Sequence, residues 1–362
     1  MKSTHRPRIG FIGAGMIAQD HMHHMAGSGR CSVAAIADVN QKAADAAAAK
    51  HKIPKTFTDY RAMLDDPEID TVAICTPPFL HRRMFMDALS AGKNVLIEKP
   101  LAITRADVSA MVKAAAAHPG LVICEASCRH SRLQPKFRFI KRIIDSGALG
   151  DIYFIHHNSV ARHARPGIEY HPAAKWFLNK KLAGAGPILD WGVYDISFHL
   201  GILGDRYSLQ STRALTKNGL DHTPHHAPIF DVEEHACAFM EFDRGLTWYW
   251  ERASNAHNEA PHQTRIYGAK GGLRFSYCTW ESSEIEFFDV ARTGKGEPRR
   301  KVYQVSMAGH TNDNKALNKH FLDCLIKGTK PAMPVARAAK HLDILFSMIE
   351  AAGESAAAQR RG

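Results

Sequence analysis

The sequence predicts two domains of different class: an N-terminal α/β domain with a doubly wound parallel sheet, and a C-terminal α+β domain with a large, open, mostly antiparallel sheet. Three observations support this. Short apolar segments alternate with helical segments through the N-terminal third of the chain, a glycine-rich turn joins the first strand to the first helix, and past residue 150 strand-like segments follow one another. Strands that alternate with helices are typical of parallel sheets, and strands that follow one another directly are typical of antiparallel sheets. We place the domains at residues 1–127 and 128–362.

Length and composition limit the class of protein. The chain has 362 residues, 45% of them hydrophobic, which suffices for two domains with full cores. No apolar run approaches the roughly 18 residues of a membrane-spanning helix, and the N-terminus lacks the apolar segment of a secretory signal. Seven cysteines without a CxxC pair are typical of reduced thiols. We therefore predict a cytoplasmic protein with no membrane partner.

The formal net charge of +11 is compatible with a protein that binds nucleic acid. The basic residues are scattered, however, and the one tight cluster, Arg299-Arg300-Lys301, is typical of the solvated edge of a hairpin. No nucleic-acid-binding motif accompanies it. We therefore predict no nucleic-acid partner, and the surplus charge suits an anionic cofactor or substrate.

The first strand, Arg8–Ile12, runs into Gly13-Ala14-Gly15-Met16-Ile17-Ala18, a G-x-G-x-x-A pattern that opens a helix. Gly13 permits a tight turn, Gly15 lets the backbone approach a ligand, and Ala18 lets the helix pack closely on the strand. The free N–H groups at the start of that helix would hold a pyrophosphate. The turn therefore predicts a dinucleotide-binding site.

The second strand, Cys31–Ala37, ends at Asp38. An acidic residue about twenty positions after such glycines can accept hydrogen bonds from the adenosine ribose, and its charge would repel a 2′-phosphate. The sequence therefore favours NAD, with NADP as the alternative cofactor. The competing interpretation of Asp38 is an N-cap for the helix that begins near Gln41.

The remaining elements of the first domain continue the alternation. We expect helices at residues 41–51, 59–65, 81–91 and 105–117, and strands at residues 55–57, 71–75, 94–98 and 121–125. This rhythm supports the parallel, doubly wound sheet.

The second domain begins with a helix and continues mainly as strands. We expect helices at residues 135–146, from about 191 to 199 and at 335–351, and strands at residues 152–158, 234–242, 246–252, 263–267, 272–276, 284–289 and 301–305. Asp243-Arg244-Gly245 predicts the turn of a hairpin. The last helix is expected to end at Gly353, before a frayed tail.

Two motifs follow neighbouring strands of the first domain. Thr76-Pro77-Pro78-Phe79-Leu80-His81 follows one strand, and Glu98-Lys99-Pro100 follows the next. Open α/β sheets bind ligands at the carboxyl ends of their strands, so both motifs are placed to contact a cofactor. Lys99 precedes a proline, which biases its backbone away from the α region. The Lys99–Pro100 bond is also a candidate cis peptide.

A third motif lies in the second domain, in the helix that follows Gly184-Ala185-Gly186. Asp195 and His199 are spaced i,i+4, so they share one face of that helix, and Asp190 and Tyr194 form a second such pair. A carboxylate and an imidazole near a lysine suffice for proton transfer from a hydroxyl.

Together these motifs resemble the glucose-fructose oxidoreductase / inositol dehydrogenase / MocA-like (Gfo/Idh/MocA) family over nearly the whole chain. The resemblance rests on the glycine turn, the T-P-x-x-x-H turn, the E-K-P tripeptide and the D-x-G-x-x-D-x-x-x-H helix. It implies a Rossmann domain and a large open sheet used in oligomerisation, and so a homodimer or homotetramer.

The resemblance also implies roles for individual residues. Lys99, Asp195 and His199 match the family's catalytic lysine, aspartate and histidine. The predicted cofactor contacts are Ile12, Gly13, Gly15, Met16, Ile17, Asp38, Thr76, Pro77, His81, Glu98 and Lys99. The predicted substrate contacts are Arg129, Arg162, Trp176, Asp190, Tyr194 and Asp195.

The chain departs from the family pattern at two points. Ala185 interrupts the expected run of three glycines, and Tyr194 stands where many members carry histidine. Both departures bear on substrate identity.

The histidine-rich stretch from His156 to Trp176, which includes Tyr170, matches no closed zinc pattern, so we predict no metal and a loop that contacts a sugar-like substrate. His222-Thr223-Pro224-His225-His226 is expected to be an exposed loop.

The sequence therefore predicts an NAD(P)-dependent oxidoreductase that transfers a hydride between the cofactor and a sugar, cyclitol or sugar acid. His199 would exchange the hydroxyl proton, Lys99 would stabilise the reacting oxygen, and Asp195 would orient His199 or bind a neighbouring hydroxyl. Two alternatives stay open: an NAD-dependent, redox-neutral glycosidase, and a non-catalytic NAD-binding regulator.

Overall fold

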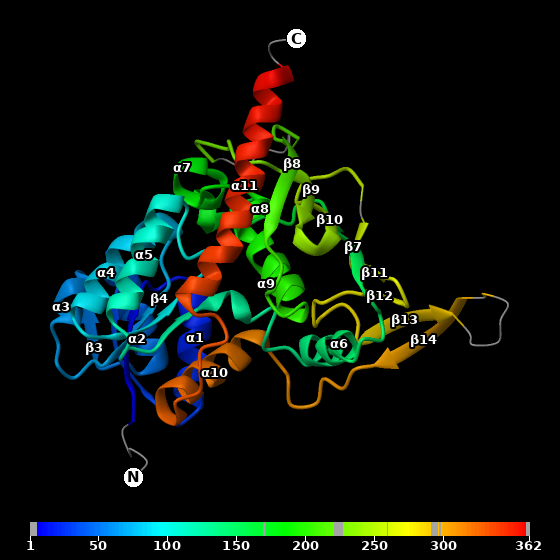
Figure 1. Ribbon diagram of the computed structural model, residues 1–362. Helices are drawn as coiled ribbons and strands as arrows, with labels where there is room; N and C mark the ends of the chain where they lie inside the picture. The colour runs from blue at the N-terminus through cyan, green and yellow to red at the C-terminus, as the bar shows by residue number, and fades with distance from the viewer. Residues whose placement is uncertain are drawn as a thin grey trace. The chain divides into compact units, whose positions relative to one another are not determined.

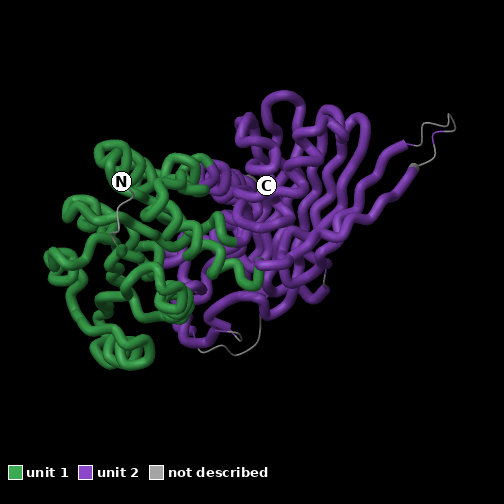
Figure 2. Tube along the Cα trace, turned by 90° about the horizontal axis from the view of Figure 1, so that it is seen from below, with its two compact units in different colours: residues 1–129, 310–340 green, residues 130–309, 341–362 purple. Residues whose placement is uncertain are grey.

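The computed structural model describes residues 6–168, 171–220, 227–258, 260–290, 296 and 298–359. Tyr170 and the segment His222–His226, for which the sequence predicted loops, lie outside these residues. The chain forms two compact units (Figure 2): unit 1 comprises residues 1–129 and 310–340, and unit 2 comprises residues 130–309 and 341–362. The first unit is thus discontinuous, because residues 310–340 belong to it instead of to the C-terminal domain.

Unit 1 contains the parallel sheet that the alternating pattern predicts (Figure 1). Its six strands lie in the order β3-β2-β1-β4-β5-β6, and every pair is parallel. The strands are β1 (Arg8–Ile12), β2 (Ser32–Ala37), β3 (Lys55–Phe57), β4 (Thr71–Ile74), β5 (Asn94–Ile97) and β6 (Ile123–Glu125). All four residues of β4 are buried, as expected of a central strand covered on both faces.

The predicted helices of unit 1 are present, with small shifts at their ends. They are α1 (Met16–Gly27), α2 (Gln41–His51), α3 (Tyr60–Leu64), α4 (His81–Ser90) and α5 (Arg105–Ala117), with short 3-10 turns η1 (Pro78–Leu80) and η2 (Ala126–Cys128). One helix of this unit was not predicted: α10 (Asp313–Lys327), which packs on α1. Its N-cap is Asn312, whose side chain accepts a hydrogen bond from the backbone N–H of Lys315.

Unit 2 contains an eight-stranded sheet in the order β14-β13-β12-β11-β7-β10-β9-β8. The strands are β7 (Ile152–Val160), β8 (Leu209–Lys217), β9 (His235–Phe242), β10 (Thr247–Ala253), β11 (Ala260–Gly268), β12 (Gly272–Phe275), β13 (Glu284–Val290) and β14 (Pro298–Gln304). Only the β7–β10 pair is parallel, so the prediction of a mostly antiparallel sheet is confirmed. The basic cluster Arg299–Lys301 lies on the edge strand β14, where Arg299 pairs with Asp289 of β13.

The helices of unit 2 include the one that carries the predicted catalytic pair. They are α6 (Pro135–Asp145), α7 (Lys180–Ala183), α8 (Pro187–Asp190) and α9 (Gly192–Ile202), with η3 (Pro172–Leu178) and η4 (Asp243–Gly245). The last helix, α11 (Val335–Gln359), begins in unit 1 and continues into unit 2, and it does not end at Gly353 as predicted. It continues through the alanine-rich segment that follows, because alanine favours helix. None of the helices in the described part of the chain has the length and apolar character needed to cross a membrane.

Candidate active site

The glycine turn of unit 1 has the geometry that nucleotide binding requires. Gly13 has φ +101°, and a Cβ at this position would lie 2.7 Å from the carbonyl oxygen of Cys75, so no other residue fits without strain. Gly15 is the N-cap of α1, and a Cβ there would meet nothing within 4 Å. Met16, the next residue, is 57% exposed. The N-terminus of α1 therefore presents backbone N–H groups to an open approach.

Asp38 contacts this turn directly. One carboxylate oxygen accepts a hydrogen bond from the backbone N–H of Ala14 at 2.8 Å, and the other accepts one from that of Asn40 at 2.9 Å. The N-cap of α2 is Asn40, whose side chain accepts from Ala43. The N-cap interpretation of Asp38 is therefore wrong, and its carboxylate lies beside the glycine turn.

His81 connects the two motifs that follow β4 and β5. Its ring is fully buried, with Nε2 2.9 Å from the carbonyl oxygen of Thr76 and Nδ1 2.9 Å from that of Pro100. Burial lowers the pKa of His81, which opposes a charged ring. His81 thus fixes the two turns relative to each other, and the Lys99–Pro100 bond between them is cis, as the sequence suggested.

Glu98 is held in a buried polar network of unit 1. Its carboxylate accepts hydrogen bonds from Nε2 of His21 at 2.9 Å, from the guanidinium of Arg129, and from the backbone N–H of Lys99 at 3.1 Å. Although burial alone would raise the pKa of Glu98, the charge of Arg129 and the bond from His21 lower it. His21 in turn contacts Asn318 of α10 through Nδ1, at 3.0 Å. This network fixes the backbone immediately before Lys99.

In unit 2, Asp195 is fully buried and surrounded by donors. Its carboxylate accepts hydrogen bonds from Nε and Nη2 of Arg252 at 3.0 and 2.8 Å, from Nε1 of Trp250 at 2.8 Å, and from the hydroxyl of Tyr277. Nε2 of His157 lies 3.2 Å away. Burial alone would raise the pKa of Asp195, but the charge of Arg252 and the neighbouring His157 hold it well below its usual range.

His199 is also fully buried, and both of its ring nitrogens are bonded. Nδ1 donates to the backbone carbonyl of Asp195 at 2.6 Å, and Nε2 lies 2.8 Å from the hydroxyl of Thr264. Burial and the nearby His157 lower the pKa of His199 to about 3. The ring is therefore neutral across the physiological pH range.

The expected contact between the two predicted catalytic side chains is not made. His199 bonds the backbone of Asp195, whereas the Asp195 carboxylate is occupied by Arg252, Trp250 and Tyr277. The i,i+4 spacing placed them on one face correctly, but every residue of α9 is buried. Both side chains are bonded within the core of unit 2.

The second pair, Asp190 and Tyr194, has different surroundings. Asp190 lies near Arg165, with Oδ2 3.7 Å from Nη1. The ring of Tyr194 lies 4.8 Å from that of His130 and 5.3 Å from that of Trp191. Tyr194 is itself buried, but His130 and Trp191 are partly exposed. This pair is therefore nearer to solvent than the first.

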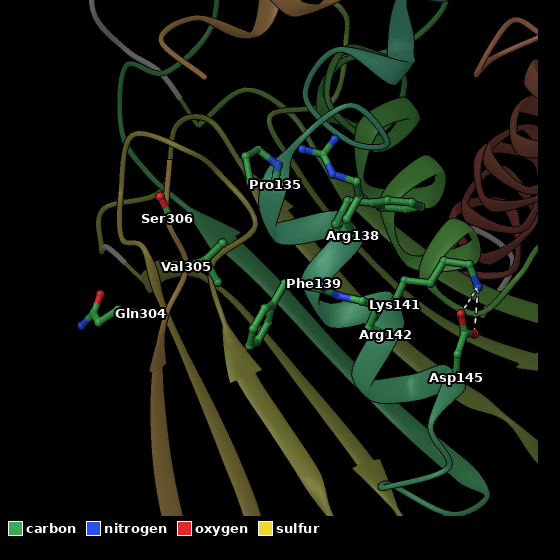
Figure 3. A pocket seen from close by; sticks show the side chains of 10 residues that line it. Pro135, Arg138, Phe139, Lys141, Arg142, Asp145, Gln304, Val305 and Ser306 are labelled. Carbon is green, nitrogen blue, oxygen red and sulfur yellow. Dashed lines mark hydrogen bonds and ion pairs between the residues drawn. The ribbon is translucent and has the colours of Figure 1, made fainter. Parts of the chain in front are cut away.

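The other predicted substrate contacts have partners within their own units. Arg129 belongs to unit 1 and pairs with Glu98. Arg162 contacts Nε2 of His257 at 3.1 Å, and Trp176 stacks on Phe177 with ring centroids 3.8 Å apart. A cavity of about 600 Å³ lies between α6 and the end of β14 (Figure 3), and none of the predicted site residues lines it.

Two side-chain groups within the described residues place potential metal ligands close together: His157, Asp195 and His262, and His262, Cys278 and Glu281. Asp195 already neutralises the guanidinium of Arg252, so a cation there would add uncompensated positive charge to the core. We propose no metal site, and the absence of a metal remains a prediction.

Sequence reasoning missed the residues that determine the environment of Asp195. Arg252 lies 57 positions further along the chain. A signal was present: Trp248, Trp250 and Arg252 alternate along β10 on the buried face, and an arginine on such a face requires a carboxylate partner. It could not have named Asp195 as that partner.

Comparisons with known proteins support the interpretation of both units. Residues 7–125 match a family model described as "Oxidoreductase family, NAD-binding Rossmann fold", and residues 137–274 match one described as "GFO/IDH/MocA C-terminal domain". Trans-1,2-dihydrobenzene-1,2-diol dehydrogenase of Bos taurus is 26% identical, covering 96% of this chain and 97% of its own length. Levoglucosan dehydrogenase of Pseudarthrobacter phenanthrenivorans is 26% identical, and the match covers 70% of this chain and 67% of that protein.

Inositol 2-dehydrogenase 2 of Saccharopolyspora erythraea is 30% identical, and the match covers 59% of this chain and 58% of that protein. Among solved structures, a levoglucosan dehydrogenase in complex with NADH and levoglucosan superposes with a TM-score of 0.82 at 21% identity, covering 97% and 98% of the two chains. At that identity the likeness establishes the fold alone.

Proposed function

Because the chain belongs to the Gfo/Idh/MocA family of NAD-dependent oxidoreductases, we propose that it transfers a hydride between the nicotinamide and a hydroxyl-bearing carbon of a polyhydroxylated substrate. The substrate class is a sugar, a cyclitol or a sugar acid. Relatives named for levoglucosan, inositol and a dihydrodiol support this class, because each name denotes a ring that carries hydroxyl groups.

The residues of unit 1 fit the cofactor. The N–H groups at the start of α1, beside Gly13 and Gly15, would hold its pyrophosphate, and Asp38 would accept hydrogen bonds from its adenosine ribose. Bound NAD supplies the hydride acceptor. The observation that carries the proposal is this open glycine turn with the Asp38 carboxylate bonded to it. Asp38 favours NAD over NADP because its charge repels a 2′-phosphate.

Lys99 would stabilise the reacting oxygen. Its ammonium group would donate a hydrogen bond to the substrate hydroxyl and offset the negative charge that develops as the proton leaves. The network around Glu98 supports this role, because it holds the backbone N–H of Lys99 in place. His81 adds to this by holding the adjacent Pro100.

For the proton itself, we propose Tyr194 in place of His199. As a phenolate, Tyr194 would take the proton of the substrate hydroxyl, and the phenol so formed would later lose that proton to solvent. Support comes from the surroundings of the two groups: His199 has both nitrogens bonded in the core, whereas Tyr194 contacts the partly exposed His130 and Trp191. Asp195 and His199 would then act as positioning residues that hold α9.

The test is a panel of sugars, inositols and sugar acids, followed at the nicotinamide absorbance with NAD and with NADP. Tyr194→Phe and His199→Gln form a matched pair on one helix. We expect Tyr194→Phe to lower kcat by about 10²-fold or more at unchanged stability. We expect His199→Gln to retain most of kcat per folded molecule. If Tyr194→Phe kept its kcat and His199→Gln lost it, His199 would be the residue that takes the proton. Cleavage of a glycoside without net formation of NADH would favour the glycosidase alternative.

We also propose a homo-oligomer formed through the open face of the unit 2 sheet. Several large apolar side chains of that sheet remain exposed, among them Tyr153 of β7, Phe239 of β9 and Tyr267 of β11. Such a patch is typical of a protein interface.

The seven cysteines, none of them in a disulfide, fit the predicted cytoplasmic location.

A further inference from the structure

Four rings of unit 2 form a cluster beside the proposed proton-transfer residue. His130 stacks on Trp191 with centroids 5.7 Å apart, and its ring lies 4.8 Å from Tyr194 and 5.4 Å from Trp280. Trp191 lies 6.0 Å from Trp280. We refer to His130, Trp191, Tyr194 and Trp280 as the aromatic cluster. Three of its members come from separate parts of the chain, so only the fold brings them together.

Trp280 is the exposed member of this cluster. Its side chain is 57% exposed, although tryptophan is highly buried on average. The aromatic cluster thus runs from the buried Tyr194 to an indole that contacts solvent. An aromatic surface in this position can contact a ligand whose reacting group lies near Tyr194.

The segment that carries Trp280 is firmly held. Lys136 of α6 is fully buried, and its ammonium group donates to the carbonyl oxygens of Ser276 at 2.8 Å and Cys278 at 2.6 Å. Tyr277, between them, donates its hydroxyl to Asp195. A buried lysine has a large desolvation cost, which these bonds must offset. The exposure of Trp280 is therefore built into a fixed segment.

The Trp191 side of the cluster is held by the same core. The guanidinium of Arg252 lies over the Trp191 ring, with Cζ 4.9 Å from the centroid, and it is bonded to Asp195. Asp195 therefore fixes both ends of the cluster, through Arg252 to Trp191 and through Tyr277 to the segment before Trp280. Rigid aromatic surfaces lose little conformational freedom when a ligand binds.

We propose that Trp280 is the stacking surface for a ring-shaped substrate, and that it makes the enzyme select cyclic polyols over acyclic ones. This rests on the proposed function. One face of a pyranose or cyclitol ring presents C–H groups that pack on an indole, while its hydroxyl groups remain free for polar contacts. A flexible acyclic polyol presents no such face.

The experiment compares Trp280→Ala, Trp280→Phe and a matched control, Val290→Ala, which removes a side chain of similar exposure, 56%, from β13. Rates with NAD are measured on myo-inositol and a pyranose, and on the acyclic D-sorbitol. For the ring substrates we expect Trp280→Ala to raise KM about tenfold with little change in kcat, and Trp280→Phe to recover most of that loss. For sorbitol we expect no more than about a twofold change.

A second readout separates this inference from the proposed function. Tryptophan fluorescence is titrated with the same compounds in the NADH-loaded wild type and Trp280→Phe proteins, without turnover. A change that only the wild type shows supports stacking even if no compound is oxidised, a result that would defeat the proposed function alone. Equal effects of Trp280→Ala on ring and acyclic substrates, or no ring-induced change in wild-type fluorescence, would overturn the inference.

Discussion

Unit 1 and unit 2 each contain a buried carboxylate paired with an arginine and a histidine, and the two clusters differ in what they hold. Glu98 binds Arg129 and His21, and the next residue along the chain is Lys99. Asp195 binds Arg252 with two hydrogen bonds, and its other partners are Trp250, Tyr277 and His157. Glu98 fixes a backbone at a strand end, whereas Asp195 joins α9 to β10 and to the segment after β12.

The difference lies in the partners: Glu98 accepts a backbone N–H at a strand end, whereas Asp195 accepts side-chain donors from two other segments of unit 2. Both carboxylates stay ionised, since an arginine lowers the pKa of each against the effect of burial. Neither is suited to exchange a proton at neutral pH. The distinction is in what each one positions: a candidate catalytic lysine in unit 1 and an aromatic surface in unit 2.

The largest expected effect comes from breaking the Asp195 cluster. Asp195→Asn leaves the guanidinium of Arg252 buried without its counter-charge, which costs about 3–5 kcal/mol in the free energy of unfolding. Denaturant titration measures this loss, with Asp151→Asn, at an exposed position, as control. A loss below about 1 kcal/mol would mean that Asp195 is not the main partner of Arg252.

Lys99→Ala tests the other cluster. Removing the ammonium group should lower kcat by about 10²–10³-fold, because the reacting oxygen loses its charged donor. Stability and NADH affinity should change little, as measured by denaturant titration and by fluorescence. Lys113→Ala, on the exposed face of α5, is the control. Wild-type turnover by Lys99→Ala would remove Lys99 from the mechanism.

The pH dependence of stability tests whether His199 is structural. Burial depresses the pKa of His199 from 6.5 to about 3, so below pH 6.5 the unfolded chain gains a proton that the folded chain does not. The His199 contribution to stability therefore falls as the pH falls, by about 1–2 kcal/mol between pH 6.5 and pH 5.

The comparison of wild type with His199→Gln isolates this contribution. Glu125 acts in the opposite direction, because burial raises its pKa to about 7 and its protonated form is favoured in the fold. Both proteins contain Glu125, so the difference between their unfolding free energies at pH 6.5 and pH 5 reports His199. A difference that does not vary with pH would contradict the neutral, buried ring.

The smallest effect concerns cofactor choice. Asp38→Ala should weaken NAD binding about tenfold relative to NADP, because the ribose loses an acceptor and a 2′-phosphate loses a repelling charge. Fluorescence titration with NADH and NADPH measures the ratio, and Asp45→Ala, exposed on α2, is the control. An unchanged ratio would show that Asp38 serves the glycine turn alone.

Local patterns predicted the fold well where the cause of structure is local. The glycine turn at Gly13, the hairpin turn at Asp243–Gly245 and the cis bond at Lys99–Pro100 all depend on a few consecutive residues. The edge strand β8 escaped prediction because much of it is polar or exposed, which hides the alternation of a strand. Helix α10 was not predicted, although Leu317, Phe321 and Cys324 recur at helical spacing on its buried face.

The site was predictable only in part for a similar reason. Spacing places Asp195 and His199 on one face of a helix, but burial of that face depends on β10 and β11, which lie more than fifty positions away. The partners of the buried groups, Arg252 and Thr264, are specified by tertiary packing. A motif therefore identifies important positions, but it does not distinguish residues that take part in the reaction from residues that stabilise the fold.

The discontinuity of unit 1 has a consequence for how the protein is made. His21 bonds Asn318, and the N–H of Glu125 bonds the carbonyl of Met333, so the N-terminal segment lacks these two partners until residues 310–340 exist. During synthesis the whole stretch from His130 to Gly309 emerges in between. The nucleotide-binding unit begins first on the ribosome, yet it completes its core only after most of the chain has been translated.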